Sequence, residues 1–384
     1  MTIESQLEAK RPLVAGLQRV VVKIGSSLLT DPDGLRTTQI ETLARELAAI
    51  HARGVAVTLV SSGAIAAGRS RLPIGEHPTI PERQAAAAVG QIHLMSAYEE
   101  VFSEYGIQVA QILLDADDLA SRHRYMNAAH AVETLQQHKI LPIVNENDTV
   151  SIDELKFGDN DHLSSMVASL VRADLLIILS DVGGMYTANP AREQDAERIP
   201  LIARIDAPLL ARARGRGSSV ATGGMESKLR AARKAATAGI PTIITDGRVT
   251  GALERAIDPT CDEGTLILPV GDRLGRREHW IAFSVKPRGS LHLDKGAVIA
   301  VSEEGRSLLP SGLTALEGRF EAGDCVSLFD PQGHEFARGL ASYTSREMAS
   351  ILGKQSGEVE GILGYKMGSS IVHRNDLVLL NSLE

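Results

Sequence analysis

Three polar residues in a row, Asp159, Asn160 and Asp161, follow Gly158 and precede a segment with helical spacing of its apolar residues. From Leu163 the apolar residues recur at positions 166, 167, 170 and 171, which predicts a helix that begins near the triplet. One Asp or Asn would suffice as a cap, because a single side-chain oxygen satisfies the free N–H groups of the first turn. Three polar groups are more than a cap needs, so the triplet is either ordinary turn chemistry or part of a functional site.

Two lysines stand where a phosphate group could bind. Lys23 follows three valines and precedes Ile24-Gly25. Its ammonium would be costly to bury without an anion, although a lysine at a strand end can also extend to solvent. Gly25 would let backbone N–H groups approach a phosphate. Lys228 closes the stretch TGGMESK, where it would lie in the first turn of a helix and oppose the helix dipole.

Two glycine-containing loops, each with a lysine, predict a nucleotide site. The chain has no GxxxxGK[ST] motif, so the site is not of the Walker type. It also has no GxGxxG after its first predicted strand, which argues against a dinucleotide-binding dehydrogenase.

These residues need a scaffold, and short apolar runs that alternate with helical patterns predict one between residue 19 and about 260. The six runs cover residues 19–25, 54–63, 106–115, 139–148, 173–181 and 239–247. Continuously apolar strands alternating with helices indicate a mostly parallel sheet covered by helices on both faces. In the intervening helix at 38–53, Thr38 and Glu41 are expected to form a capping box.

Polar residues end several of these runs: Ser61-Ser62, the stretch Asn145 to Asp148, and Ser180-Asp181. Ligands of open α/β sheets bind beyond the carboxyl ends of the strands. We therefore expect these side chains to converge with Lys23 at one edge of the sheet.

The chain is expected to have three parts. An α/β catalytic domain spans residues 1–260, a linker spans 261–285, and a small mostly-β barrel spans 286–384, where short strands alternate with Gly- and Asp-rich turns.

Composition limits the location and the partners of the chain. Two cysteines without CxxC spacing exclude a disulfide framework or a cysteine metal site, and the scattered histidines show no metal-ligand spacing, so no protein metal site is predicted. The first residues carry acids and no apolar core, so we expect no secretory signal. The longest strongly apolar run, residues 175–179, is too short to span a membrane. We expect a cytoplasmic protein. A net charge of −8 gives no general attraction to nucleic acid or anionic lipid.

The motifs VVKIGSSLL, VSSGAIAAGR, NENDTV, KFGDNDHLS, LSDVGGMYTANP and TGGMESK, in this order, resemble the glutamate 5-kinases of the amino-acid kinase family. The last hundred residues resemble the PUA domain that many bacterial members carry. The chain departs from the family pattern at Ser180, where Thr is common, and at Glu226-Ser227, where a Ser-Thr pair is common.

The resemblance implies a role for each group of residues. Glutamate would be bound by Ser62, Asp148 and Asn160. Lys23 and Lys228 would flank the phosphoryl group in flight, and Asp161 would hold both lysines in place. The ATP site would comprise Lys23, Ser180, Asp181, Thr222, Gly223, Gly224, Met225, Glu226, Ser227 and Lys228.

The chemistry is consistent with that set of residues. The nucleophile would be a glutamate carboxylate with a pKa of about 4.3, which is ionised at neutral pH and needs no general base. Mg²⁺ would bridge the ATP phosphates with no assigned protein ligand. The resemblance also implies feedback inhibition by proline, channelling to glutamyl phosphate reductase, and a homo-oligomer, either a dimer or a tetramer.

Two alternatives remain at this point. The chain could be another kinase of the family that uses aspartate or N-acetylglutamate. It could instead be an RNA-binding regulator that acts through the PUA-like part. Residues 286–384 carry 10 Lys and Arg against 13 Asp and Glu, and this balance of −3 disfavours RNA, because RNA-binding modules usually present a basic face.

Overall fold

The computed structural model describes residues 2–31, 34–75, 78–150, 160–190, 192–214, 224–270, 276–366 and 368–380. The chain forms two compact units. One comprises residues 1–118 with 123–273, and the other comprises residues 119–122 with 274–384. No helix in these ranges is long and apolar enough to cross a membrane.

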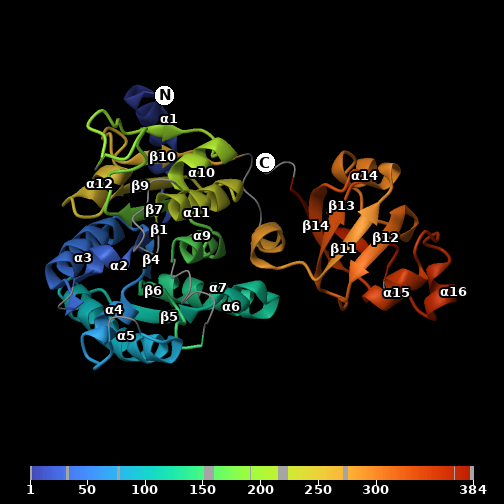
Figure 1. Ribbon diagram of the computed structural model, residues 1–384, viewed down its shortest axis with the longest axis horizontal. Coiled ribbons are helices and arrows are strands. Elements are labelled where there is room, and N and C mark those ends of the chain that lie inside the picture. The colour runs from blue at the N-terminus through green and yellow to red at the C-terminus, as the bar shows by residue number, and fades with distance from the viewer. Residues whose placement is uncertain are drawn as a thin grey trace. The chain divides into compact units, whose positions relative to one another are not determined.

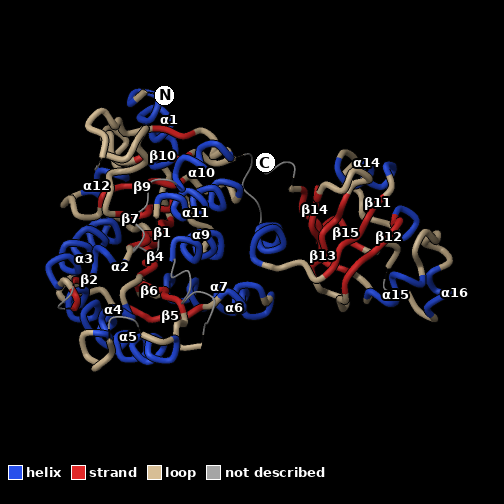
Figure 2. The backbone as a smooth tube through the Cα atoms, in the orientation of Figure 1, coloured by secondary structure: helices blue, strands red, loops and turns tan. Residues whose placement is uncertain are grey.

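The chain up to residue 273 alternates strands and helices (Figures 1 and 2). Its described strands are β1 (Arg19–Ile24), β2 (Thr30–Asp31), β3 (Gly34–Leu35), β4 (Ala56–Ser61), β5 (Val109–Leu114), β6 (Leu141–Glu146), β7 (Leu175–Ser180), β8 (Leu201–Ile202), β9 (Thr242–Asp246) and β10 (Thr265–Ile267). Its described helices are α1 (Ile3–Ala15), α2 (Ser26–Leu29), α3 (Thr37–Ala52), α4 (Ala64–Arg69), α5 (Ile80–Ser103), α6 (Ala116–Ala120), α7 (Arg122–Gln137), α9 (Asn160–Leu170), α10 (Ala207–Arg214), α11 (Met225–Thr237) and α12 (Ala252–Ile257).

The main sheet has the strand order β5-β6-β4-β1-β7-β9-β10-β8 among the described residues. The first six strands in this order, β5, β6, β4, β1, β7 and β9, run parallel to one another. Strand β10 pairs antiparallel with β9 and parallel with β8. The six predicted runs are the six parallel strands, so the predicted mostly parallel sheet is confirmed.

Burial explains why these runs read as continuously apolar. Every residue of β7 is buried, and β1 and β4 are buried except for their first residues. Strands of a parallel sheet are covered by helices on both faces, so neither face needs polar residues. The edge strand β5 is the contrast, because only its last residue, Leu114, is buried.

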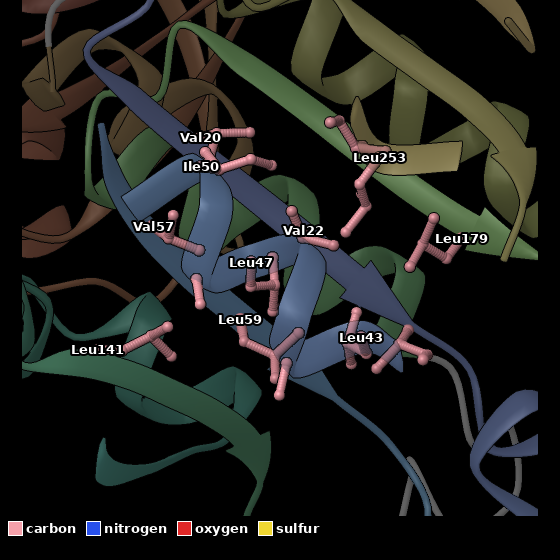
Figure 3. Close-up of a cluster of buried hydrophobic side chains, with 14 of the residues drawn as sticks. Val20, Val22, Leu43, Leu47, Ile50, Val57, Leu59, Leu141, Leu179 and Leu253 are labelled. Carbon is pink, nitrogen blue, oxygen red and sulfur yellow. The ribbon is translucent and has the colours of Figure 1, made fainter. Parts of the chain in front are cut away.

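Helix α3 packs its apolar face onto β1 and β4 (Figure 3). Leu43, Leu47 and Ile50 recur at helical spacing and meet Val22 and Leu59 from the strands. Helices α2, α4 and α5 lie on the same side as α3, whereas α9, α10 and α11 lie on the other (Figure 1). Helix α9 contacts both β1 and β4, and its first residues bond to the ends of these strands.

Two local expectations require correction. Thr265–Ile267 falls in the stretch predicted as linker, but it forms β10 of the main sheet. The capping box at Thr38 and Glu41 is wrong, since α3 begins one residue earlier with Arg36 as its N-cap and no side-chain cap bond. Thr38 is already inside the helix, so its hydroxyl is not at the cap position.

The second unit has its own apolar core and a five-stranded sheet among its described residues, in the order β12-β11-β13-β14-β15. Its strands are β11 (Gly289–Leu293), β12 (Leu313–Gly318), β13 (Cys325–Phe329), β14 (Glu335–Ala341) and β15 (Val372–Leu379). Its helices are α13 (Arg276–His279), a π-helix (Trp280–Ser284), α14 (Lys295–Ser302), a 3₁₀ turn (Pro310–Gly312), α15 (Ser345–Ser350) and α16 (Val359–Leu363). The expected mostly-β character of this part is confirmed.

Candidate active site

Lys23 lies near the carboxyl end of β1, in the middle of the sheet. It pairs in register with Val60 of β4 on one side and Ile178 of β7 on the other. The lysine is 3% exposed, so its ammonium is not extended into solvent. The structure thereby favours an anionic partner over the solvent-exposed strand-end alternative.

That partner is Asp161, in the first turn of α9. Its Oδ1 forms an ion pair with Lys23 Nζ, and its Oδ2 lies 3.2 Å from Lys228 Nζ. Ser227 Oγ donates a third hydrogen bond to Oδ2 at 2.8 Å. Asp161 is fully buried and Lys228 is 6% exposed. Two cations from opposite ends of the domain sequence therefore converge on one carboxylate.

Electrostatics keep the Asp161 carboxylate ionised. Burial by itself raises the pKa of Asp161, because a charged carboxylate loses its water. Coulombic attraction to Lys23 and Lys228, with hydrogen bonds from Lys23 and Ser227, outweighs that effect and holds the pKa well below its ordinary value. The position at the start of α9 also suits a negative charge, since the N-terminus of a helix carries positive partial charge.

Asn160, the residue before Asp161, connects the end of β4 with the end of β6. Its Nδ2 group lies 2.8 Å from Ser61 O, 3.0 Å from Ser62 Oγ and 2.9 Å from Asn145 Oδ1. Ser62 N in turn donates to Ile24 O at the end of β1. The start of α9 thus places the amide and the carboxylate side by side in two adjoining clusters.

Lys228 reaches Asp161 from the first turn of α11, which begins at Met225 after Gly224. Ser227 Oγ also lies 2.8 Å from Gly224 O. The acidic Glu226 of this turn is bound by Arg230 one turn later, with Nε at 2.9 Å and Nη2 at 2.7 Å from Glu226 Oε1. The charge of Glu226 is therefore balanced within α11.

The remaining predicted residues lie at the same sheet edge or outside the described residues. Ser180 ends β7, where its hydroxyl donates to Asp181 Oδ1 at 3.2 Å. Asp148 is half-buried just beyond β6. Thr222, Gly223 and Asp159 lie outside the described residues.

Sequence reasoning missed several supporting residues. Tyr98 of α5 is fully buried, and its hydroxyl lies 2.8 Å from Ser61 Oγ, next to the carbonyl that accepts from Asn160. Gln91, also on α5, accepts a 2.8 Å hydrogen bond from Asn145 Nδ2. Asn145 had a signal, because it stands at a polar strand end, whereas Gln91 and Tyr98 lie within a 24-residue helix and carry no local motif.

No group of three or more His, Cys, Asp or Glu residues that could hold a metal ion occurs in the described part of the chain. Asp161, the buried carboxylate of the site, is bound to two lysines and a serine.

Comparison with known proteins identifies the class to which this fold and site belong. The model of the amino acid kinase family matches residues 18–246, and the model of the PUA domain matches residues 289–363. The glutamate 5-kinase of Citrifermentans bemidjiense is 49% identical over 373 residues, covering 97% of this chain and 100% of that protein. The glutamate 5-kinase of Trichlorobacter lovleyi is also 49% identical, covering 97% of this chain and 99% of that protein.

Among solved structures, a carbamate kinase from Giardia is similar with 19% identity and a TM-score of 0.47, covering 66% of this chain and 99% of that one. The family match and the full-length relatives show that the chain belongs to the amino acid kinase family, and within it to the glutamate 5-kinases, with a PUA domain at residues 289–363.

Proposed function

We propose that this protein transfers the γ-phosphoryl group of ATP to the side-chain carboxylate of L-glutamate. The products are L-glutamyl 5-phosphate and ADP, and the reaction is the first step toward proline. The observation that carries the proposal is the buried cluster at the start of α9, where Lys23 and Lys228 share the carboxylate of Asp161. The full-length similarity to glutamate 5-kinases supports the choice of substrate.

The reaction needs positioning and positive charge more than acid–base catalysis. The attacking carboxylate is already ionised at neutral pH. The two anions must be held in line, and the charge on the transferring oxygens must be stabilised. Lys23 and Lys228 would supply that charge from fixed positions, which avoids reorganisation during the reaction.

Asp161 would act by holding the two lysines and not as a base. Its lowered pKa makes it a poor proton acceptor, and both of its oxygens are bound to cations. Fixing two ammonium groups on one buried carboxylate sets the distance between them. Asp161 is therefore proposed as the organiser of the catalytic lysines.

The substrates would occupy the two adjoining clusters. We assign glutamate to Ser62, Asp148 and Asn160. We assign ATP to Ser180, Asp181, the stretch 222–228 and Lys23. The N-terminus of α11, with Gly224 in extended conformation before it, offers free backbone N–H groups for phosphate oxygens. Glu226 would not repel the nucleotide strongly, because Arg230 binds its carboxylate.

Mg²⁺ fits this arrangement as a companion of the ATP phosphates. It commonly keeps several waters and phosphate ligands, so it does not require a protein cage. When bound, it would neutralise charge on the phosphates. The part of the chain that the structure describes assigns no side chain to it.

Further proposals rest on the family resemblance. They are feedback inhibition by proline, channelling to glutamyl phosphate reductase, assembly as a dimer or tetramer, and a cytoplasmic location. The division into a catalytic domain and a PUA-like domain at 286–384 is also a proposal. The assignment of β10 to the main sheet supports a catalytic domain that extends beyond residue 260.

The test is an ATP- and Mg²⁺-dependent assay in which hydroxylamine traps the acyl phosphate as a hydroxamate. L-Glutamate should give the product, and aspartate or N-acetylglutamate should give much less. Equal or better turnover of N-acetylglutamate would contradict the proposal.

A further inference from the structure

Three side-chain amides form a hydrogen-bonded chain from α9 through β6 to α5. Asn160 Nδ2 donates to Asn145 Oδ1 at 2.9 Å, and Asn145 Nδ2 donates to Gln91 Oε1 at 2.8 Å. The contacts join residues 15 and 54 positions apart in the sequence. One end of the chain adjoins the catalytic cluster, because Asn160 precedes Asp161.

Backbone groups fix the direction of each amide. Asn160 must turn its Nδ2 toward Ser61 O, because a carbonyl can only accept. Asn145 must turn its Oδ1 toward Glu146 N, 2.9 Å away, because a backbone N–H can only donate. Asn145 Nδ2 is therefore the donor to Gln91, whose Oε1 accepts. The orientation of Gln91 follows, and its Nε2 points away from Asn145.

Within this series of three amides, one buried acceptor and one buried donor have no hydrogen-bond partner among the described residues. The acceptor is Asn160 Oδ1, and the donor is Gln91 Nε2. Buried polar side-chain atoms in native proteins are hydrogen-bonded in the large majority of cases. Two such atoms at the two ends of a fixed relay beside a catalytic cluster indicate a ligand that brings both a donor and an acceptor.

We propose that Gln91 determines substrate specificity by donating a hydrogen bond from Nε2 to the α-carboxylate of the amino-acid substrate, while Asn160 Oδ1 accepts from its α-ammonium. This inference rests on the proposed function and adds a binding residue to it. An α-amino acid carries an ammonium donor and a carboxylate acceptor on one carbon, which matches the two unpaired atoms.

The neutral amides of Gln91 and Asn160 would also distinguish the α-carboxylate of glutamate from its side-chain carboxylate. Lys23 and Lys228 would attract either carboxylate by charge alone. Gln91 and Asn160 instead select the end of the molecule where a carboxylate and an ammonium stand together. The α-end is thereby held away from the lysines, and the side-chain carboxylate is the one left to attack the phosphoryl group.

The decisive variant is Gln91→Glu. A glutamate side chain has nearly the same shape, and one of its oxygens can still accept from Asn145 Nδ2. The other oxygen replaces the Nε2 donor and would face the substrate carboxylate with like charge. 4-Aminobutyrate is the matched ligand, because it is glutamate without the α-carboxylate and keeps the ammonium.

The measurement is the dissociation constant of each ligand for the full-length protein by calorimetry, followed by kcat and KM in the hydroxamate assay. Losing a hydrogen bond to a charged group should weaken glutamate binding by about 10- to 100-fold. Binding of 4-aminobutyrate should be unchanged or tighter, so the preference for glutamate over 4-aminobutyrate should fall by at least about tenfold. The KM for ATP should stay near that of the unaltered protein.

Gln136→Glu is the control, because Gln136 Nε2 donates to Thr58 Oγ1 in the same unit, away from the strand ends. It should leave the preference unchanged. Gln91→Met serves as the second variant if Gln91→Glu does not fold, and it should also lower the preference. An unchanged preference in a folded Gln91 variant would overturn the inference. Failure of the unaltered protein to phosphorylate glutamate would overturn the proposed function instead.

Discussion

Buried lysines occur in two regions of the catalytic unit, and their surroundings differ. Lys23 and Lys228 share the buried carboxylate of Asp161 at the sheet edge. Lys10 of α1 is fully buried, and its Nζ donates to two backbone carbonyls, Arg255 O at 2.6 Å and Cys261 O at 3.0 Å. One region balances its cations with an anion inside the protein, whereas the other binds its cation mainly with neutral dipoles.

The consequence of this difference appears in the pKa values. Burial lowers the pKa of Lys10 to about 8, because the surrounding charges, including Cys261 and Asp258, only partly offset the loss of water. The pKa of Asp161 is lowered, because two lysines and a serine stabilise the charged carboxylate more than burial destabilises it. Lys10 is thus suited to docking α1, together with Gln6, which donates to Glu263 O and Gly264 O. Under the proposed function, the Asp161 cluster would present positive charge to a phosphoryl group.

The first prediction separates the two regions by catalysis. Lys23→Ala and Lys228→Ala should each lower kcat by on the order of 10²-fold or more, the scale for losing one preorganised charge donor. Lys10→Ala is the matched control and should change kcat by less than about tenfold, because Lys10 contacts backbone groups on α12 and the following loop. A near-normal kcat in either site variant would remove that lysine from the catalytic set.

The same comparison predicts how the site variants combine. Asp161→Ala should resemble the lysine variants, because lysines without their organiser lose most of their effect. The double variant Lys23→Ala/Asp161→Ala should then fall well short of the product of the single effects, since the residues act as a unit. Independent, multiplicative effects measured by single-turnover kinetics would show that Asp161 does not act through Lys23.

The second prediction concerns stability. Asp161→Asn should lower the free energy of unfolding by about 3–5 kcal/mol, because it leaves two buried ammonium groups without their anion. The folded pKa of Asp161 is depressed, so its stabilisation is present above its unfolded pKa of about 3.9 and is lost only as pH falls below that value. The deficit of the variant in urea unfolding should therefore be the same at pH 5.5 and pH 6.5, where the unpaired lysines of the variant are still protonated. A deficit that vanished within this range would contradict the assignment.

The third prediction concerns Lys10 and alkaline pH. Its folded pKa of about 8 lies below its unfolded value of 10.5, so the unfolded chain binds more protons between these values. Stability from this group should rise as pH increases from about 8 to 10.5, by on the order of 3 kcal/mol. Lys10→Met should lack this component. Parallel curves for the two proteins in urea unfolding at pH 7.5 and 10 would show that Lys10 is not held in a buried site.

The fourth prediction has the smallest effect. Ser227→Ala removes one neutral donor from Asp161 and should lower the free energy of unfolding by about 1 kcal/mol. The kcat should fall several-fold, well short of the lysine variants, because both cations remain. Ser165→Ala on α9, whose hydroxyl donates to a backbone carbonyl, is the control and should leave kcat unchanged. A loss as large as that of Lys228→Ala would assign Ser227 a direct role in phosphoryl transfer.

The sequence by itself determined the strands of the parallel sheet and the polar residues that end them. Six apolar runs predicted the six parallel strands, because a strand covered on both faces has no polar side. The triplet at 159–161 predicted the start of a helix, and α9 begins at Asn160. The polar residues at the strand ends were predicted to gather at one edge of the sheet, because the carboxyl ends of parallel strands lie on the same side. Each of these inferences depends on local periodicity or local composition.

The tertiary structure alone decided which distant residues meet. Lys23 and Lys228 are joined through Asp161 because β1 is central and α9 and α11 pack side by side on one face. Gln91 reaches Asn145 from the middle of a long helix that has no motif, and β10 enters the sheet from a segment that read as linker. Periodicity reports which side of an element is buried. It does not report which element covers that side, because the partner depends on the strand order and the packing of the whole sheet.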